Sequence, residues 1–114
     1  MNNTQNQAFI ESFEALSTEA HNTARENGWW DSYISGAEAI ALMLGELSEA
    51  LEALRNGNGP DKNLPQFIGT EVEPADVIIW IMDLARERGW KVAEALVAKM
   101  AFNKTRPHKH GKEF

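Results

Sequence analysis

Apolar residues recur at helical spacing in four segments of the chain, and no useful length alternates between polar and apolar residues as a strand would. In the first segment, Phe9, Phe13 and Leu16 form such a stripe. Turn-forming residues separate the segments, most clearly at Asn56-Gly-Asn-Gly-Pro60. The predicted helices run from about residue 4 to 27, from a cap at 35 to about 55, from about 70 to 89, and from about 90 to 104. We therefore expect an all-α fold, a compact four-helix bundle.

Length and composition limit the class of protein. A chain of 114 residues can bury a core without covalent staples, so we expect a single domain over residues 1–114, with a basic C-terminal tail over 105–114. The absence of cysteine excludes disulfides and thiolate metal sites and favours a reducing, cytoplasmic setting. The N-terminus lacks the pattern of a secretory signal, and the longest apolar run, residues 77–82, is too short to cross a membrane. A net charge of −6 argues against binding to long nucleic acid.

Two acidic pairs carry the main chemical signal, Glu46-Leu-Ser-Glu49 in the second segment and Glu73-Pro-Ala-Asp76 in the third. Residues three apart project from the same side of a helix. If the two sides face each other, four carboxylates gather in a small volume, where their mutual repulsion favours a hard divalent cation. The pattern therefore predicts a magnesium-type site, with Mn²⁺ as an alternative ion.

The neighbours of the first pair indicate that it faces another helix. On a helical wheel, Glu46 and Glu49 share an arc with mostly small apolar residues, namely Ala39, Leu42, Ala50 and Ala53. The main apolar stripe occupies a different arc and comprises Ile40, Met43, Leu44, Leu47, Leu51 and Leu54. Because small side chains permit close approach, we expect a second helix to leave the two carboxylates partly buried.

Apolar residues surround most of the third helix, which is therefore expected to be central. Its remaining polar arc comprises Glu73, Asp76, Trp80, Asp83 and Glu87. A buried carboxylate must be paired, protonated or bound to a metal. The ordinary alternative is that Glu73 and Asp76 interact with the macrodipole at the helix start. Either a capping box from Thr70 to Glu73, or a Glu73 cap before Pro74, would place them there.

The fourth segment supplies the opposite charge. Lys99 and Asn103 continue an apolar seam that includes Leu96, and Arg106 follows one turn later. A lysine in line with core positions is typical of an ammonium that reaches an anion, and such a row suits a phosphate chain. The alternative for Lys99 is an alkyl stem on the apolar surface with its ammonium in water.

Together these motifs resemble the MazG-like all-α nucleoside triphosphate pyrophosphohydrolases. The resemblance covers about residues 30–106 and rests on the ordered combination of both acidic pairs with Lys99-Met-Ala-Phe-Asn103-Lys-Thr-Arg106. It implies a Mg²⁺-dependent enzyme acting on a phosphoric anhydride, which splits (deoxy)nucleoside triphosphates into monophosphate and pyrophosphate and cleans the nucleotide pool. It also implies a homodimer or homotetramer, and apolar residues on several faces of the second and third helices agree with this.

The resemblance also implies roles for individual residues. The implied metal ligands are Glu46, Glu49, Glu73 and Asp76. The implied substrate-binding residues are Trp30, which would stack on or wall the base, and Lys99, Asn103 and Arg106, which would hold the phosphates. Glu49 is our candidate, on its position alone, for the base that takes a proton from the attacking water.

Two features depart from the family pattern, and two other functions stay open. The family often doubles the acid before its first motif, where this chain has Gly45, and Pro74 falls inside the second motif, which affects the aim of Glu73. A phosphoribosyl-ATP pyrophosphohydrolase is the alternative within the same chemistry. From another class, the alternative is a non-catalytic helical module that binds a nucleotide or a protein.

Several other residues have ordinary interpretations beside functional ones. Trp30 also fits packing between the first two helices or at a subunit contact. His108 and His110 have the spacing of a metal pair, although an exposed tail favours solvated histidines. The cationic tail, which includes Lys112, would suit closure over bound phosphates. His21 is most simply a surface or helix-packing residue.

Overall fold

The computed structural model describes residues 2–111, and within them the chain is all-helical. Four α-helices are followed by a short 3₁₀ helix: α1 (Asn3–Glu26), α2 (Gly36–Arg55), α3 (Gly69–Arg88), α4 (Val92–Lys104) and η1 (His108–Gly111). The predicted four-helix, all-α class is confirmed, and the predicted helix bounds agree to within two residues. None of the helices in residues 2–111 has both the length and the apolar character needed to cross a membrane.

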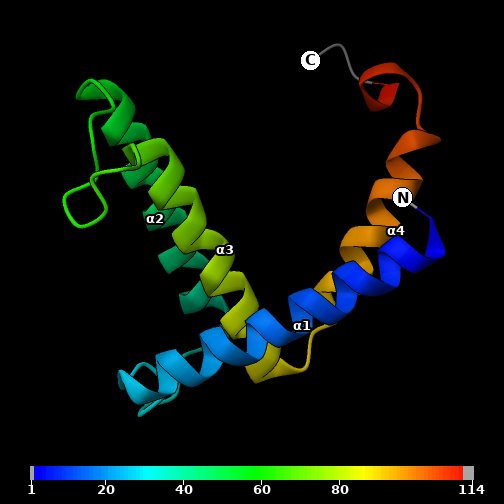
Figure 1. Cartoon of the computed structure of the whole chain (residues 1–114), viewed down its shortest axis with the longest axis horizontal. Helices are drawn as coiled ribbons and strands as arrows, with labels where there is room; N and C mark the ends of the chain where they lie inside the picture. The colour runs from blue at the N-terminus through cyan, green and yellow to red at the C-terminus, as the bar shows by residue number, and fades with distance from the viewer. Residues whose placement is uncertain (1, 112–114) are drawn as a thin grey trace.

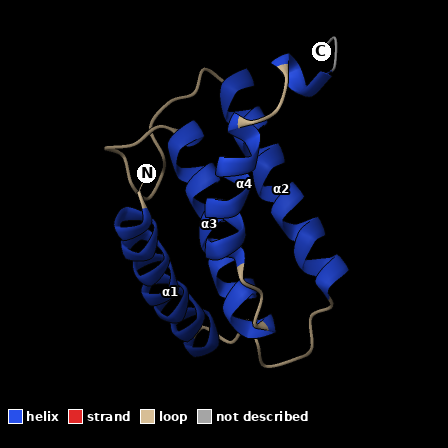
Figure 2. Ribbon diagram, turned by 90° about the vertical axis from the view of Figure 1, so that its right-hand side faces the viewer, coloured by secondary structure: helices blue, strands red, loops and turns tan. Residues whose placement is uncertain are grey.

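Helix α3 is the centre of the fold, as its apolar circumference predicts. It packs against α2 on one side and α1 on the other (Figure 2), and α4 packs against α1 (Figure 1). α2 and α3 run antiparallel and form one arm, whereas α4 and the N-terminal half of α1 form a second arm (Figure 1). The Cα radius of gyration is 16.5 Å, larger than the ~13 Å of a compact domain of about 100 residues. The helix contacts are those of a bundle, but the two arms diverge.

Local capping signals explain where the helices begin. Ser35 accepts a hydrogen bond from the Glu38 backbone N–H, as the sequence predicts for α2. The predicted Thr70–Glu73 capping box is wrong, because α3 already begins at Gly69. There the Asn58 side chain accepts a 3.1 Å hydrogen bond from the Thr70 N–H and donates to its hydroxyl. A residue of the preceding loop, Asn58, thus accepts a hydrogen bond from a backbone N–H at the start of α3, where a side chain of α3 itself was expected to do so.

The two apolar faces of α2 have different environments. The face with small residues packs toward α3: Ala39 is buried, and Glu46, Ala50 and Ala53 are partly buried. Met43, which the helical wheel places in the large apolar stripe, is also partly buried. The face with large residues is exposed in a single chain and comprises Ile40, Leu44, Leu47, Leu51 and Leu54, each 47–62 % exposed. The small-residue face of α2 packs on α3 because small side chains allow the two helix backbones to approach closely.

Candidate functional site

Three of the four residues in the two acidic pairs meet between α2 and α3. Carboxylate oxygens of Glu46 and Glu49 from α2 and of Glu73 from α3 all lie within 4.8 Å of one another. This is the meeting of faces that the spacing predicts. The three side chains form a compact group of oxygen donors, which is the ligand type that Mg²⁺ and Mn²⁺ prefer.

A glycine at the start of α3 makes this meeting possible. A Cβ added at Gly69 would lie only 2.6 Å from the Cβ of Ala53 on α2. Real Cβ atoms do not approach so closely, so only glycine permits this helix spacing. The contact lies one turn before Glu73, and it therefore sets how near the α3 carboxylate comes to those of α2.

Mutual repulsion and burial favour the protonated forms of these acids. The pKa of Glu73 is raised to about 7, first by burial and then by its contacts with Glu49 and Glu46. The pKa of Glu46 is also raised, by burial and by the charge of Glu49. Without a cation, the cluster is an unfavourable arrangement of negative charge at neutral pH.

Asp76 lies apart from this three-residue group, although the charge of Glu49 also acts on it. Its pKa is raised, mainly by burial and then by the charges of Asp61 and Glu49. Asp61 belongs to the loop before α3, and its carboxylate accepts hydrogen bonds from the backbone N–H groups of Asn63 and Leu64, both at 2.9 Å. Sequence reasoning missed Asp61, because a lone aspartate in a polar loop carries no spacing signal.

The helix start explains why Glu73 and Asp76 are not ordinary end charges. Because α3 begins at Gly69, Glu73 is its fifth residue, Pro74 its sixth and Asp76 its eighth. The free N–H groups and the positive dipole end lie within the first turn, where Glu71 is the acidic residue. The expectation that the pair lies at the helix start is wrong, and the macrodipole does not account for it.

One atom of the cluster fits a cation directly. Glu73 Oε2 is one of four buried side-chain atoms in the described residues that have no hydrogen-bond partner, and it is the one that belongs to the cluster. A buried acceptor of this kind is costly unless a proton or a positive ion occupies it. Three carboxylates from two helices, one of them orphaned, therefore form a donor set suited to a hard divalent ion.

The basic row is on the other arm of the molecule. Lys99 and Asn103 are exposed on α4, and Arg106 follows the helix and is partly buried. Lys99 Nζ and Arg106 Cζ lie 5.1 and 5.5 Å from the centroid of the Phe102 ring, so both cations gather around one aromatic side chain. Within one chain this row is separated from the acidic cluster by the divergence of the arms (Figure 1).

Trp30 lies in the connector between α1 and α2 and belongs to a hydrogen-bonded cluster that joins this connector to α1 and α3. Its indole N–H donates to both carboxylate oxygens of Asp83, at 2.8 and 3.1 Å. His21 Nδ1 lies 2.8 Å from Asp83 Oδ1, and its Nε2 lies 3.3 Å from Glu87 Oε2. His21 and Asp83 are both buried. His21 is thus a helix-packing residue; the i, i+4 spacing of Asp83 and Glu87 is the signal that could have predicted its partners.

The predicted metal pair of His108 and His110 is described only in part, because the side chain of His110 lies outside the described part of the structure. His108 is exposed at the start of η1. The predicted role of Lys112 lies outside the described residues, as do residues 113 and 114. Gly45, which precedes the first acidic pair, is exposed with open space around it.

Comparison with known proteins adds no relative to these observations: no protein-family model, curated protein or solved structure matches the chain.

Proposed function

We propose that this protein is a Mg²⁺-dependent nucleoside triphosphate pyrophosphohydrolase that releases pyrophosphate and a nucleoside monophosphate. The observation that carries the proposal is the three-carboxylate group of Glu46, Glu49 and Glu73, with its buried, unpartnered oxygen. The resemblance of the ordered acidic and basic motifs to the MazG-like enzymes supplies the reaction.

The acidic residues divide the work between binding and proton transfer. Glu46, Glu49, Glu73 and Asp76 would hold the cation, which supplies positive charge to offset that of the substrate phosphates. Glu49 is the most exposed of the three clustered acids, and we therefore assign to it the proton transfer from the attacking water. In the reaction, a water oxygen bonds to the α-phosphorus while the α–β anhydride bond breaks. The water's proton passes to the Glu49 carboxylate, and pyrophosphate leaves.

The protein is proposed to act as a homo-oligomer. The exposed α2 residues Ile40, Leu44, Leu47, Leu51 and Leu54 follow one another at intervals of four, three, four and three. That is the spacing of a helix-packing seam, and large apolar side chains repeated along one helix favour another helix as a cover. A second copy of the chain would bury this seam. Such an assembly would also allow the basic row of one copy to approach the acids of another.

Pyrophosphate release tests the activity directly. The full chain is incubated with a panel of ribo- and deoxynucleoside triphosphates and with phosphoribosyl-ATP, with Mg²⁺, with Mn²⁺ and with EDTA. We expect metal-dependent release of pyrophosphate, lost in Glu49→Gln and retained in the surface control Glu38→Gln. In ¹⁸O-water the label should enter the monophosphate. Inactivity on every triphosphate with either metal would reject the proposal and favour a binding module.

A further inference from the structure

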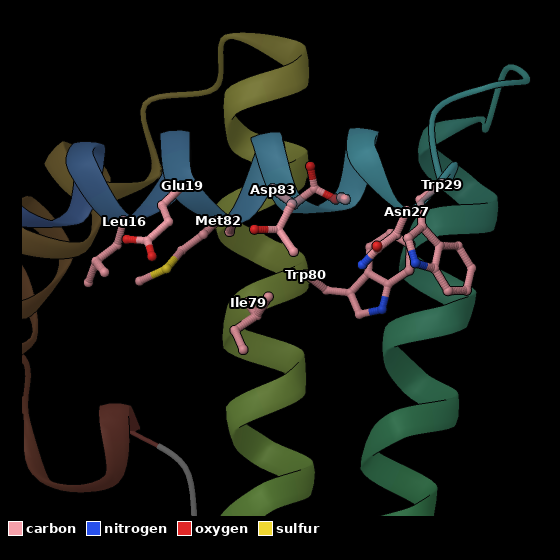
Figure 3. Close-up of a pocket in the computed structure, with 11 residues that line it drawn as sticks. Leu16, Glu19, Asn27, Trp29, Ile79, Trp80, Met82 and Asp83 are labelled. Carbon is pink, nitrogen blue, oxygen red and sulfur yellow. The ribbon is translucent and has the colours of Figure 1, made fainter.

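A cavity of about 430 Å³ opens in the corner where α1 crosses α3, a size within the range of small-molecule sites. It has two chemically different ends (Figure 3). Trp29, Trp80 and Asn27 gather at one end, and Leu16, Glu19 and Met82 at the other (Figure 3). The residues that line it include two acids and no lysine or arginine. A neutral ligand therefore suits this cavity better than a phosphate.

The aromatic end offers surfaces for a planar ring. The rings of Trp29 and Trp80 meet edge to face, with centroids 5.7 Å apart and an interplanar angle of 72°. In such a pair one indole presents its edge to the other, so its own faces are not covered by that partner, and Trp29 is 53 % exposed. Asn27 lies beside them, and no hydrogen bond to another described residue engages its side-chain amide. An amide carries both donors and an acceptor, which match the polar edge of a heteroaromatic ring.

One residue that lines the cavity, Trp80, lies on the side of α3 that carries the acidic residues. Trp80 follows Asp76 by four residues and Glu73 by seven, so the three side chains project from the same side of the helix. At the helical rise, these separations are about 6 Å and about 10 Å. A ligand with its ring against Trp80 can therefore extend a charged group along α3 toward the carboxylates.

Side-chain contacts fix the connector between α1 and α2, which carries Trp29. Its neighbour Trp30 donates to Asp83, which also contacts His21 of α1. These contacts join the connector to two helices and restrict the position of the adjacent Trp29. A ring site whose walls are ordered before binding loses less entropy when the ligand enters.

We infer that the aromatic end of this cavity binds the nucleobase of the substrate, stacked on Trp29 or Trp80 with its polar edge toward Asn27. This inference rests on the proposed nucleotide hydrolysis. Trp29 and Trp80 contact the nucleobase, whereas Trp30 positions the connector that carries Trp29. The phosphate chain then extends along α3 to Glu73 and Asp76.

Nucleosides without phosphate test the ring site separately from the reaction. Binding of adenosine, guanosine, cytidine, uridine and thymidine to the full chain is measured by calorimetry without metal. At least one nucleoside should bind, and Trp29→Leu should weaken it by about 5- to 100-fold, the usual range for loss of a stacking partner. Asn27→Ala should change the order of preference among bases. Trp90→Phe, at an exposed tryptophan outside the cavity lining, is the matched control and should bind like the parent protein.

The outcomes separate the two proposals. If triphosphates are hydrolysed but Trp29→Leu and Trp80→Leu keep the parent's KM, the ring site is wrong and the hydrolase stands. If nucleosides bind as expected but no triphosphate is cleaved, the ring site stands and the hydrolase is wrong. Loss of self-association in Trp29→Leu, with nucleoside binding absent in the parent protein, would show that a second copy fills the cavity and would overturn the inference.

Discussion

Gly69 at the start of α3 lies against Ala53 near the end of α2, with room for no side chain between them: a Cβ at Gly69 would be 2.6 Å from that of Ala53. This contact lies one turn from Glu73, whose carboxylate meets those of Glu46 and Glu49. A residue with no chemistry of its own therefore determines how closely the candidate metal ligands approach.

Gly69→Ala should separate α2 from α3 and destabilise the chain. We expect a loss of about 1–3 kcal/mol in the free energy of unfolding, the usual effect of overpacking, together with weaker Mg²⁺ binding. Gly45→Ala is the matched control, because Gly45 lies mid-helix with open space around it. That change should stabilise α2 by about 0.5–1 kcal/mol. Urea unfolding measures both variants; equal or greater stability of Gly69→Ala would contradict the steric account.

The acidic cluster should make the metal-free protein less stable as pH rises. The pKa of Glu73 is raised from 4.5 to about 7 in the folded chain. A carboxyl with a raised pKa holds its proton more tightly when folded, so its contribution is complete below about pH 4.5 and is lost as pH rises through about 7. Glu46 and Asp76 shift in the same direction. Thermal unfolding in EDTA from pH 5 to 8 should show this fall.

Glu73→Gln separates charge repulsion from metal binding. At pH 8 without metal, the variant should unfold at a higher temperature than the parent, by about 4 °C if about 1 kcal/mol of repulsion is removed. Added Mg²⁺ or Mn²⁺ should stabilise the parent and have little effect on the variant. A parent protein that neither metal stabilises at millimolar concentration would exclude a divalent site at these carboxylates.

The exposed seam of α2 should hold the oligomer together. Replacing Leu47 and Leu51 together by lysine places charge at the centre of the seam and should yield a monomer. Leu42→Lys is the control, since Leu42 is similarly exposed on another face of α2 and should leave the assembly unchanged. Sedimentation velocity measures the result. A monomeric parent protein at micromolar concentration would refute the proposed assembly.

His21 should be a major contributor to the packing of α1 on α3. Its removal leaves Asp83, which is only 3 % exposed, without the histidine partner at 2.8 Å. We expect His21→Ala to cost about 3 kcal/mol of unfolding free energy, as does loss of one member of a buried pair. Arg55→Ala breaks the exposed Glu52–Arg55 pair as a control and should cost less than about 1 kcal/mol. Near-UV circular dichroism should also change, because the His21 ring lies 6.0 Å from the Trp30 ring and both residues contact Asp83.

Local patterns in the sequence determined the helices and the central place of α3. Helical periodicity, the Ser35 cap and the turn around Gly57 act within a few residues, so they can be recognised without knowledge of the fold. The same reasoning predicted that Glu46 and Glu49 are partly buried against a neighbouring helix; Glu46 is partly buried, but the prediction is wrong for Glu49, which is exposed. Both acids nevertheless meet Glu73.

Only the tertiary structure decided which surfaces meet and which distant residues join. The leucine face of α2 is the more apolar, yet the alanine face packs on α3, because Gly69 fits only small partners. Asn58 caps α3, and His21 meets Asp83, across 12 and 62 residues respectively. α4 lies on α1, which separates Lys99 from the acids within one chain. Such contacts depend on the shapes of whole helix surfaces and on which pair of surfaces packs best. The spacing of residues along one helix specifies neither.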